Sequence, residues 1–226
     1  MVLRLWPGVS GIFTETMASN MPVAYSKGGS TMESEILGSM IEVRFHGRGG
    51  QGAVVASNIL AEAGFLEGKE VSAFPFFGVE RRGAPVTAYT RVSDRKIRIK
   101  SGIYAPDFVI VMDPTLVKAV NVVEGLKPEG LVLVNTKENA DSLRRGLGIT
   151  GEQKVATIDA TGIAIKHRLG SKAAPIVNSS VLGAFARASG LVKLESLVSS
   201  IRHNVPVKLD ENTAAAKEAF ESVVMQ

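Results

Sequence analysis

The sequence contains no cysteine among its 226 residues. This absence excludes disulfide bonds, a thiol nucleophile and cysteine-ligated iron–sulfur clusters in this chain. The only histidines are His46, His167 and His203, and their spacing is not that of a zinc site. No apolar run approaches the length of about 18 residues that a membrane span requires. We therefore expect no metal site in this chain and no membrane association.

Charge of one sign is also scarce, because the formal net charge is only +4. That excess suits an acidic partner, but it falls short of the basic stripe of a dedicated nucleic-acid-binding protein, so we expect no nucleic-acid partner. Hydrophobic residues make up 45% and charged residues 21% of the chain, which is enough to bury the core of one domain of moderate size. We see no signal peptide and expect a cytoplasmic protein.

Residues 1–39 differ in composition from the rest of the chain. They are rich in Ser, Gly, Thr and Met and show no sustained hydrophobic period. We interpret them as a flexible N-terminal extension that precedes a domain of residues 40–226. Two explanations stay open: the start codon is assigned too far upstream and Met40 is the true start, or the extension is an arm that orders on a partner.

From Ile41 onward, short apolar strands alternate with segments of helical period, which predicts an α/β fold. We expect a Rossmann-like, mixed but mostly parallel sheet with helices on both faces. Three loops should meet at the carboxyl ends of its strands: residues 47–52, residues 74–83 and the turn after Asp113. The predicted strands are Ile41–His46, Val71–Phe74, Ala84–Val92, Lys96–Ile99 (a hairpin with the preceding strand), Asp107–Met112, Gly130–Val134 and Val155–Ile158. The predicted helices follow Gly52 and Pro114 and cover Ser180–Ala188, Leu194–Ile201 and Glu211–Val224, the last capped by Asp210 or Asn212.

A glycine-rich turn lies between the first strand and the first helix, with the residues Gly47, Arg48, Gly49, Gly50, Gln51 and Gly52. Glycines allow a tight turn, and the helix N-terminus offers free N–H groups to an anion. The turn matches the dinucleotide pattern G-x-G-x-x-G. However, the expected acid at the end of the second strand is missing, because that strand ends in Ala73-Phe74-Pro75. Dinucleotide binding, an anion or partner surface, and a turn needed only for packing all stay open.

A second distinctive loop follows the second strand and reads Phe74-Pro75-Phe76-Phe77-Gly78-Val79-Glu80-Arg81-Arg82-Gly83-Ala84-Pro85-Val86. Tandem arginines can hold a phosphate or carboxylate in planar forks, and exposed aromatics beside arginine are typical of an interface. The alternative is that the phenylalanines belong to the core and the arginines are solvated. Glu80 is better suited to an ion pair than to general-base catalysis, so we assign no catalytic residue.

Together the two loops closely resemble those of the gamma subunit of 2-oxoacid:ferredoxin oxidoreductases. A third segment agrees, with Pro175-Ile176-Val177-Asn178 followed by Leu182-Gly183-Ala184-Phe185. The resemblance runs from about Met40 to the last helix. The form of the second loop is similar to that of the pyruvate and branched-chain versions of the family.

The resemblance implies a subunit of a complex that converts a 2-oxoacid, coenzyme A (CoA) and oxidised ferredoxin to acyl-CoA, CO₂ and reduced ferredoxin, most directly with pyruvate. It implies alpha, beta and delta partner subunits, with thiamine diphosphate, Mg and iron–sulfur clusters on the partners and CoA bound with them. This chain would hold none of these cofactors alone and would be inactive alone. The alternatives are a stand-alone dinucleotide-binding oxidoreductase and a non-catalytic scaffold of the same fold.

The resemblance and the residue chemistry together give a set of candidate site residues. A CoA-, anion- or partner-facing surface is predicted to contain Gly47, Arg48, Gly49, Gly50, Gln51, Gly52, Arg81, Arg82 and Asn178. Phe76 and Phe77 are predicted to contact the catalytic subunits. For Asn178, a helix N-cap is the competing interpretation.

Overall fold

The computed structural model describes residues 40–76 and 83–226. A seven-stranded sheet runs through the domain in the order β2-β3-β1-β4-β5-β6-β9. Its strands are β1 (Met40–Arg48), β2 (Glu70–Phe76), β3 (Pro85–Ser93), β4 (Phe108–Val111), β5 (Leu131–Asn135), β6 (Lys154–Ile158) and β9 (Val224–Met225). The helices are α2 (Ala53–Leu66), α3 (Leu116–Ala119), α4 (Ala140–Gly146), α5 (Ala160–Lys166), α6 (Asn178–Ser189), α7 (Leu194–Asn204) and α8 (Leu209–Ser222), and β7 (Gly170–Ser171) with β8 (Ala174–Pro175) forms a small hairpin.

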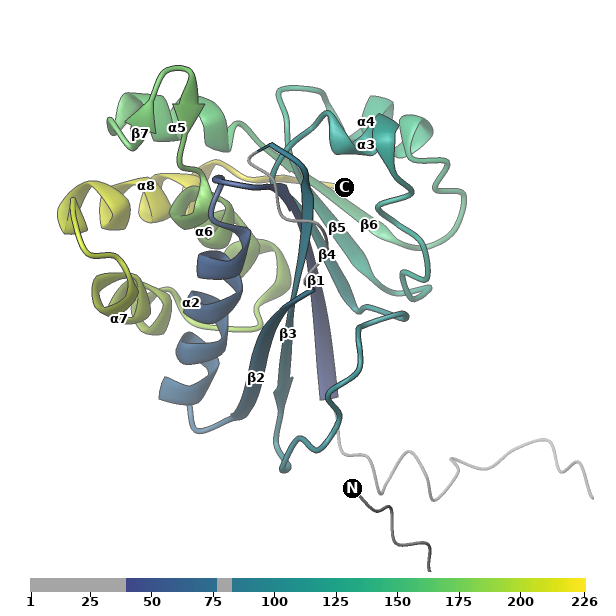
Figure 1. The fold of residues 1–226 in the computed structure, drawn as a ribbon. Helices are drawn as coiled ribbons and strands as arrows, with labels where there is room; N and C mark the ends of the chain where they lie inside the picture. The colour runs from purple at the N-terminus through teal and green to yellow at the C-terminus, as the bar shows by residue number, and fades with distance from the viewer. Residues whose placement is uncertain (1–39, 77–82) are drawn as a thin grey trace, which may run out of the picture.

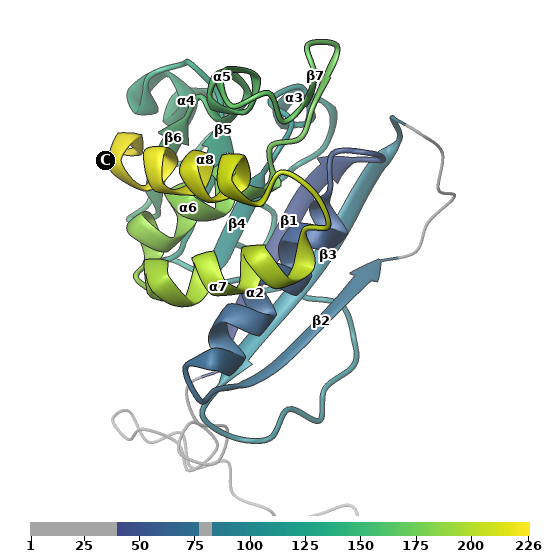
Figure 2. The same ribbon diagram turned by 90° about the vertical axis from the view of Figure 1, so that its left-hand side faces the viewer.

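The sheet is mixed, as the sequence predicts. Strands β1, β4, β5 and β6 are paired in parallel, whereas β3 runs antiparallel to both β1 and β2, and β9 runs antiparallel to β6. Helices α2, α6, α7 and α8 cover one face, and α3 and α4 lie on the other (Figure 1). Turned by 90°, the view shows α2 and α7 in front of the sheet, with β2 and β3 extending past them (Figure 2). The predicted α/β class with helices on both faces is therefore confirmed.

Each face of the sheet has its own apolar core, because successive side chains of a strand point to opposite faces. Phe45, Ile110 and Leu133 pack with α2, α6 and α8, and the rings of Phe108 and Phe185 meet edge-on at 5.3 Å. Val109, Val132 and their neighbours pack on α3 and α4. Strands β4 and β5 are therefore buried on both faces, which explains why their sequences are continuously apolar.

Helix α2 forms because its apolar residues recur at helical spacing and face the sheet. Ala53, Ala56, Ile59 and Leu60 are among its buried residues. The helix approaches the sheet closely at Gly64, where an added Cβ would lie 3.2 Å from Val71 Cγ1.

The strand predicted at Lys96–Ile99 is wrong. The segment is irregular, because β3 already pairs with β1 on one side and β2 on the other, so neither edge is free for a further strand. The hairpin partner of β3 is instead β2, with Phe74 opposite Tyr89.

The predicted last helix is also shorter than expected, because α8 ends at Ser222 and Val224–Met225 pairs with β6. Its N-cap is Lys208, not Asp210 or Asn212, and no side chain caps the helix. Asn212 is used elsewhere: it is 4% exposed and accepts a hydrogen bond of 2.7 Å from Ser179 Oγ on α6.

Candidate functional site

The glycine turn lies where the sequence places it, between the carboxyl end of β1 and the first turn of α2. It is held against the start of β3, because Gly49 N donates to Ala84 O at 2.9 Å and Gly83 N donates to Gly49 O at 3.2 Å. Gly50 and Gly52 have φ angles of 95° and 84°. This left-handed conformation costs a residue with a side chain about 1–2 kcal/mol, so the backbone favours glycine at both positions.

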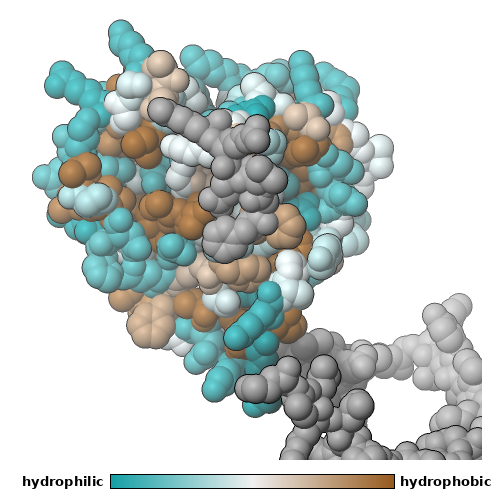
Figure 3. Space-filling view, in the orientation of Figure 1, coloured by the Kyte–Doolittle hydropathy of each residue, from teal (hydrophilic) through white to brown (hydrophobic). Residues whose placement is uncertain are grey.

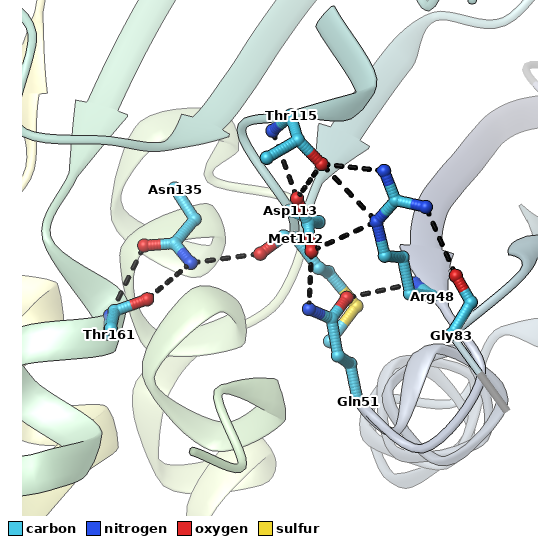
Figure 4. Close-up of polar contacts among 8 residues, drawn as sticks. All are labelled: Arg48, Gln51, Gly83, Met112, Asp113, Thr115, Asn135 and Thr161. Carbon is cyan, nitrogen blue, oxygen red and sulfur yellow. Dashed lines mark hydrogen bonds and ion pairs between the residues drawn. The ribbon is translucent and has the colours of Figure 1, made fainter. Parts of the chain in front are cut away.

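Arg48 and Gln51 do not extend freely from this turn but reach across it to Asp113, which follows β4 (Figure 4). Gln51 Nε2 donates to Asp113 Oδ2 at 2.7 Å, and Arg48 Nε lies 3.4 Å from the same oxygen. The Arg48 guanidinium also donates to Thr115 Oγ1 at 2.7 Å and to Gly83 O at 3.0 Å. Sequence reasoning recognised the turn after Asp113 as part of the site, but it missed Asp113 and Thr115 as the residues that hold Arg48.

The Asp113 carboxylate is ionised and neutralises the charge of Arg48. Burial opposes its ionisation, but hydrogen bonds from Thr115 and Gln51 and the charge of Arg48 outweigh that effect and hold the pKa of Asp113 below its ordinary value of 3.8. Attraction of an anion to this turn therefore depends mainly on backbone N–H groups rather than on Arg48.

Asp113 also explains the missing acid of the dinucleotide pattern. The strand that lies beside β1 in parallel is β4, not the next strand along the chain. An acid thus does stand at the end of the neighbouring parallel strand. Both of its carboxylate oxygens already accept hydrogen bonds from the protein, from Thr115 at Oδ1 and from Gln51 at Oδ2, so it is not free to hold a ribose.

A second polar link ties together the carboxyl ends of β4 and β5 (Figure 4). Asn135, which is buried at the end of β5, donates from Nδ2 to Met112 O at 2.8 Å and to Thr161 Oγ1 at 2.9 Å. Thr161 N donates back to Asn135 Oδ1 at 3.2 Å. This link fixes the backbone that carries Asp113, and no local pattern of residues predicts it.

Asn178 lies against the glycine turn, so the structure places it beside the loop with which it was predicted to share a surface. An added Cβ on Gly52 would lie 3.2 Å from Asn178 Nδ2. Asn178 is 4% exposed, and its Oδ1 accepts from Ser179 N at 2.8 Å. It is the first residue of α6, whose N-cap is Val177, so the N-cap interpretation is wrong. Its Nδ2 has no hydrogen-bond partner in the described part of the chain.

A cavity of about 510 Å³ opens beside Gly52 and Asn178. It lies next to the N-terminus of α2, whose first N–H groups have no acceptor within the helix. Its walls combine apolar side chains with a few polar groups, as small-molecule sites do. The lining residues are Gly50, Gly52, Val55, Leu169, Gly170, Ile176, Asn178, Asn204, Val205, Pro206, Val207, Lys208 and Asn212.

Of the two predicted interface aromatics, Phe76 lies within the described structure. It ends β2 with 59% of its surface exposed, and its ring meets Tyr89 edge-on at 6.5 Å. Phe77, Arg81 and Arg82 lie outside the described residues, so their assignments stay predictions.

Among residues 40–76 and 83–226, no group of three or more His, Asp or Glu side chains is arranged to hold a metal ion. In the same part of the chain, no helix is long and apolar enough to cross a membrane.

Comparison with known proteins agrees with this fold. The family model of pyruvate ferredoxin/flavodoxin oxidoreductase matches residues 42–222. The chain is 57% identical to the pyruvate/ketoisovalerate oxidoreductases common subunit gamma of Pyrococcus furiosus, over 80% of this chain and 96% of that protein. It is 51% identical to the pyruvate synthase subunit PorC of Methanothermobacter marburgensis, over 81% and 98%.

A solved structure supports the same assignment. The crystal structure of pyruvate oxidoreductase subunit PORC from Thermotoga maritima has a TM-score of 0.71 and 36% identity, and the match covers 83% of this chain and 98% of that one. The resemblance identified from the two loops is thus confirmed. The chain belongs to the pyruvate ferredoxin/flavodoxin oxidoreductase family.

Proposed function

We propose that this chain is the gamma subunit of a multi-subunit 2-oxoacid:ferredoxin oxidoreductase, acting most directly on pyruvate. The complex would convert pyruvate, CoA and two oxidised ferredoxins to acetyl-CoA, CO₂, two reduced ferredoxins and a proton. Alpha, beta and delta subunits would be its partners in the cytoplasm. Thiamine diphosphate, Mg and iron–sulfur clusters would belong to these partners, which agrees with a chain that has no cysteine.

Within that complex, the glycine turn and Asn178 would form this chain's contribution to the CoA site. One observation carries this proposal: the partner-free Nδ2 of Asn178, the Gly50–Gly52 backbone and the N-terminus of α2 all border one cavity. Phosphate groups are well matched to a helix N-terminus, and the apolar walls suit the less polar parts of CoA. When bound there, CoA would supply the thiol that accepts the acyl group.

The residues of this chain would bind and position CoA rather than carry out the chemistry. Asp113 and Thr115 hold Arg48 and Gln51, which fixes the turn before a ligand arrives. A pre-ordered site loses less entropy on binding. Arg81 and Arg82 are proposed to offer further positive charge to the phosphates or to an acidic partner surface.

Isolation of the chain from its native cells tests the subunit assignment. We expect thiamine- and cluster-bearing subunits to accompany it, together with pyruvate- and CoA-dependent reduction of ferredoxin. A chain isolated alone, inert with every 2-oxoacid yet bound by NAD, NADP or FAD, would instead establish the stand-alone oxidoreductase. Partners without 2-oxoacid activity would indicate a scaffold.

The CoA assignment needs its own test, since assembly alone does not prove it. Arg81→Ala/Arg82→Ala in the whole complex should raise the KM for CoA while the complex stays assembled. Loss of assembly without an effect on CoA would assign the arginines to the subunit interface. Normal assembly with an unchanged KM would rule out both roles.

A further inference from the structure

The most concentrated charge of the chain lies far from the glycine turn, in residues 95–100, which we call the basic segment. Arg95, Lys96, Arg98 and Lys100 place four cations and no acid within six residues. Their number equals the net charge of the whole chain, +4, so all the other residues together are neutral. The mild basic character of the protein therefore comes, in net terms, from one short segment.

These cations are turned toward solvent. Lys96, Arg98 and Lys100 are exposed, and within the described residues they form no ion pair and no side-chain hydrogen bond. The acids close by have other contacts: Asp94 pairs with Lys69 at 2.6 Å, and Glu42 pairs with Arg91 at 2.8 Å. Glu70 is exposed at the start of β2, where it lies opposite Ser93.

The backbone of the basic segment is held in place although it forms no strand. Arg91, which is 1% exposed, donates from Nη1 to Ile99 O and from Nη2 to Gly102 O, both at 3.3 Å. Ser93 Oγ accepts from Arg95 N at 3.1 Å. A buried arginine neutralised by Glu42 thus fixes the segment while the neighbouring cations face outward. Such pre-ordering lowers the entropy cost of binding.

The basic segment is also separate from the proposed CoA site. Pro85, at one end of β3, pairs with Arg48, and Ser93, at the other end, pairs with Met40. Nine residues of strand span roughly 27 Å. The segment runs along the side of the sheet away from α2 (Figure 1). Hydrophilic and hydrophobic side chains are mixed at this lower end of the molecule (Figure 3).

We propose that the basic segment docks an acidic surface of another subunit of the complex, so this inference rests on the proposed function. Exposed charges of one sign attract a surface of the opposite sign and orient it before close contact. A run of six residues without an aromatic side chain is a poor match for a nucleic acid, which calls for a longer basic stripe and stacking groups. Ile99, 40% exposed among the cations, gives the docked subunit an apolar contact.

The test replaces the three cations in the full-length chain expressed in its native cells as Lys96→Gln/Arg98→Gln/Lys100→Gln. The matched control is Lys118→Gln/Arg145→Gln/Lys217→Gln, which removes two lysines and one arginine that are exposed on other elements. Each complex is isolated through a tag on this chain at about 0.1 M and about 1 M NaCl, because the higher salt screens exposed charges. Partner subunits per chain are then quantified by mass spectrometry.

At the lower salt, we expect the triple variant to retain about tenfold less partner subunit than the wild type, and the control to stay within about twofold. At the higher salt, the difference should shrink because the wild type loses the same attraction. A zero-length amine–carboxyl crosslinker should join Lys96 or Lys100 to an Asp or Glu of one partner subunit.

Equal retention of the triple variant and the wild type at both salts would overturn the inference. Crosslinks only to Glu15, Glu33 or Glu35 of the same chain would also overturn it, because the occupant would then be residues 1–39. A wild-type chain that retains no subunits at either salt would instead refute the proposed function itself, together with everything that rests on it.

Discussion

The two ends of β3 differ in whether the positive charges beside them are paired within the protein. At the glycine turn, the Arg48 guanidinium contacts Asp113, Thr115 and Gly83, so its charge is used within the protein. At the other end, Arg91 forms an ion pair with Glu42, but three cations of the segment that it fixes, Lys96, Arg98 and Lys100, have no acidic partner among the described residues. The comparison teaches that an arginine in a loop motif does not by itself indicate an anion site. Its contacts within the protein determine whether its charge is available to a ligand.

Loss of Arg91 should have the largest effect on stability, because it is the more deeply buried of the two arginines. Arg91→Met leaves Glu42 without its partner and frees the carbonyls of Ile99 and Gly102. We expect the free energy of unfolding to fall by about 4 kcal/mol, measured by urea denaturation. Hydrogen exchange should also speed up in the basic segment.

The control for this prediction is Arg202→Met, whose partner Asp210 is largely solvent-exposed. That variant should change the free energy of unfolding by no more than about 0.5 kcal/mol. An Arg91→Met protein as stable as the control would show that Arg91 does not anchor the segment.

Acid should weaken the end of β1 that leads into the glycine turn. Burial, with a further contribution from Arg44, lowers the pKa of His46 from 6.5 to about 4. The unfolded chain therefore binds a proton at higher pH than the folded one does. Stability is fully present above pH 6.5 and falls as the pH drops toward about 4, a loss of about 3 kcal/mol by linkage.

This acid-dependent loss should diminish in His46→Gln, which has no group to protonate there. Denaturant unfolding at a series of pH values measures it. A wild-type protein whose stability is flat between pH 6.5 and 4 would contradict the burial of a neutral His46.

Asp113→Asn should have an intermediate effect. It removes the charge that pairs with Arg48 and weakens the bonds to Gln51 and Thr115. We expect a loss of about 2 kcal/mol. Because the pKa of Asp113 is lowered in the folded state, its contribution is present above its ordinary value of 3.8 and is lost as the pH falls below it.

Asp94→Asn gives the matched control, since Asp94 and its partner Lys69 are both well exposed. Its cost should stay within about 0.5 kcal/mol. If the two variants lost equal stability, the Asp113 network would be no more than a surface ion pair.

Two glycine variants distinguish backbone strain from ligand contact. Gly50→Ala and Gly52→Ala both place a side chain at positive φ, which costs each about 1–2 kcal/mol. Only at Gly52 does the new Cβ approach Asn178 Nδ2, at 3.2 Å, whereas nothing lies within 4 Å at Gly50. The KM of the complex for CoA should therefore rise several-fold more in Gly52→Ala. Equal KM values for CoA in the two variants would show that Asn178 does not contribute to the CoA site.

Local features of the sequence determined much of this fold. The spacing of Ala53, Ala56, Ile59 and Leu60 determined α2, and apolar runs determined β4, β5 and β6, because period and burial are encoded in neighbouring residues. The glycine turn was predictable for the same reason, and together with the loop of residues 74–86 it carried the resemblance to a known family that indicated the function. Residues 1–39 and the Arg81–Arg82 pair lie outside the described structure and stay predictions.

The pairing of strands and the contacts of the site were decided by the tertiary structure alone. The chain does not reveal that β3 inserts between β1 and β2, which leaves Lys96–Ile99 without a strand to join. Nor does it reveal that β4 lies beside β1, which brings Asp113 to Gln51 across 62 positions of sequence. Asn178 reaches Gly52 only because α6 packs beside α2. Such contacts depend on which distant segments share an edge or a face, and no local pattern of residues specifies that choice.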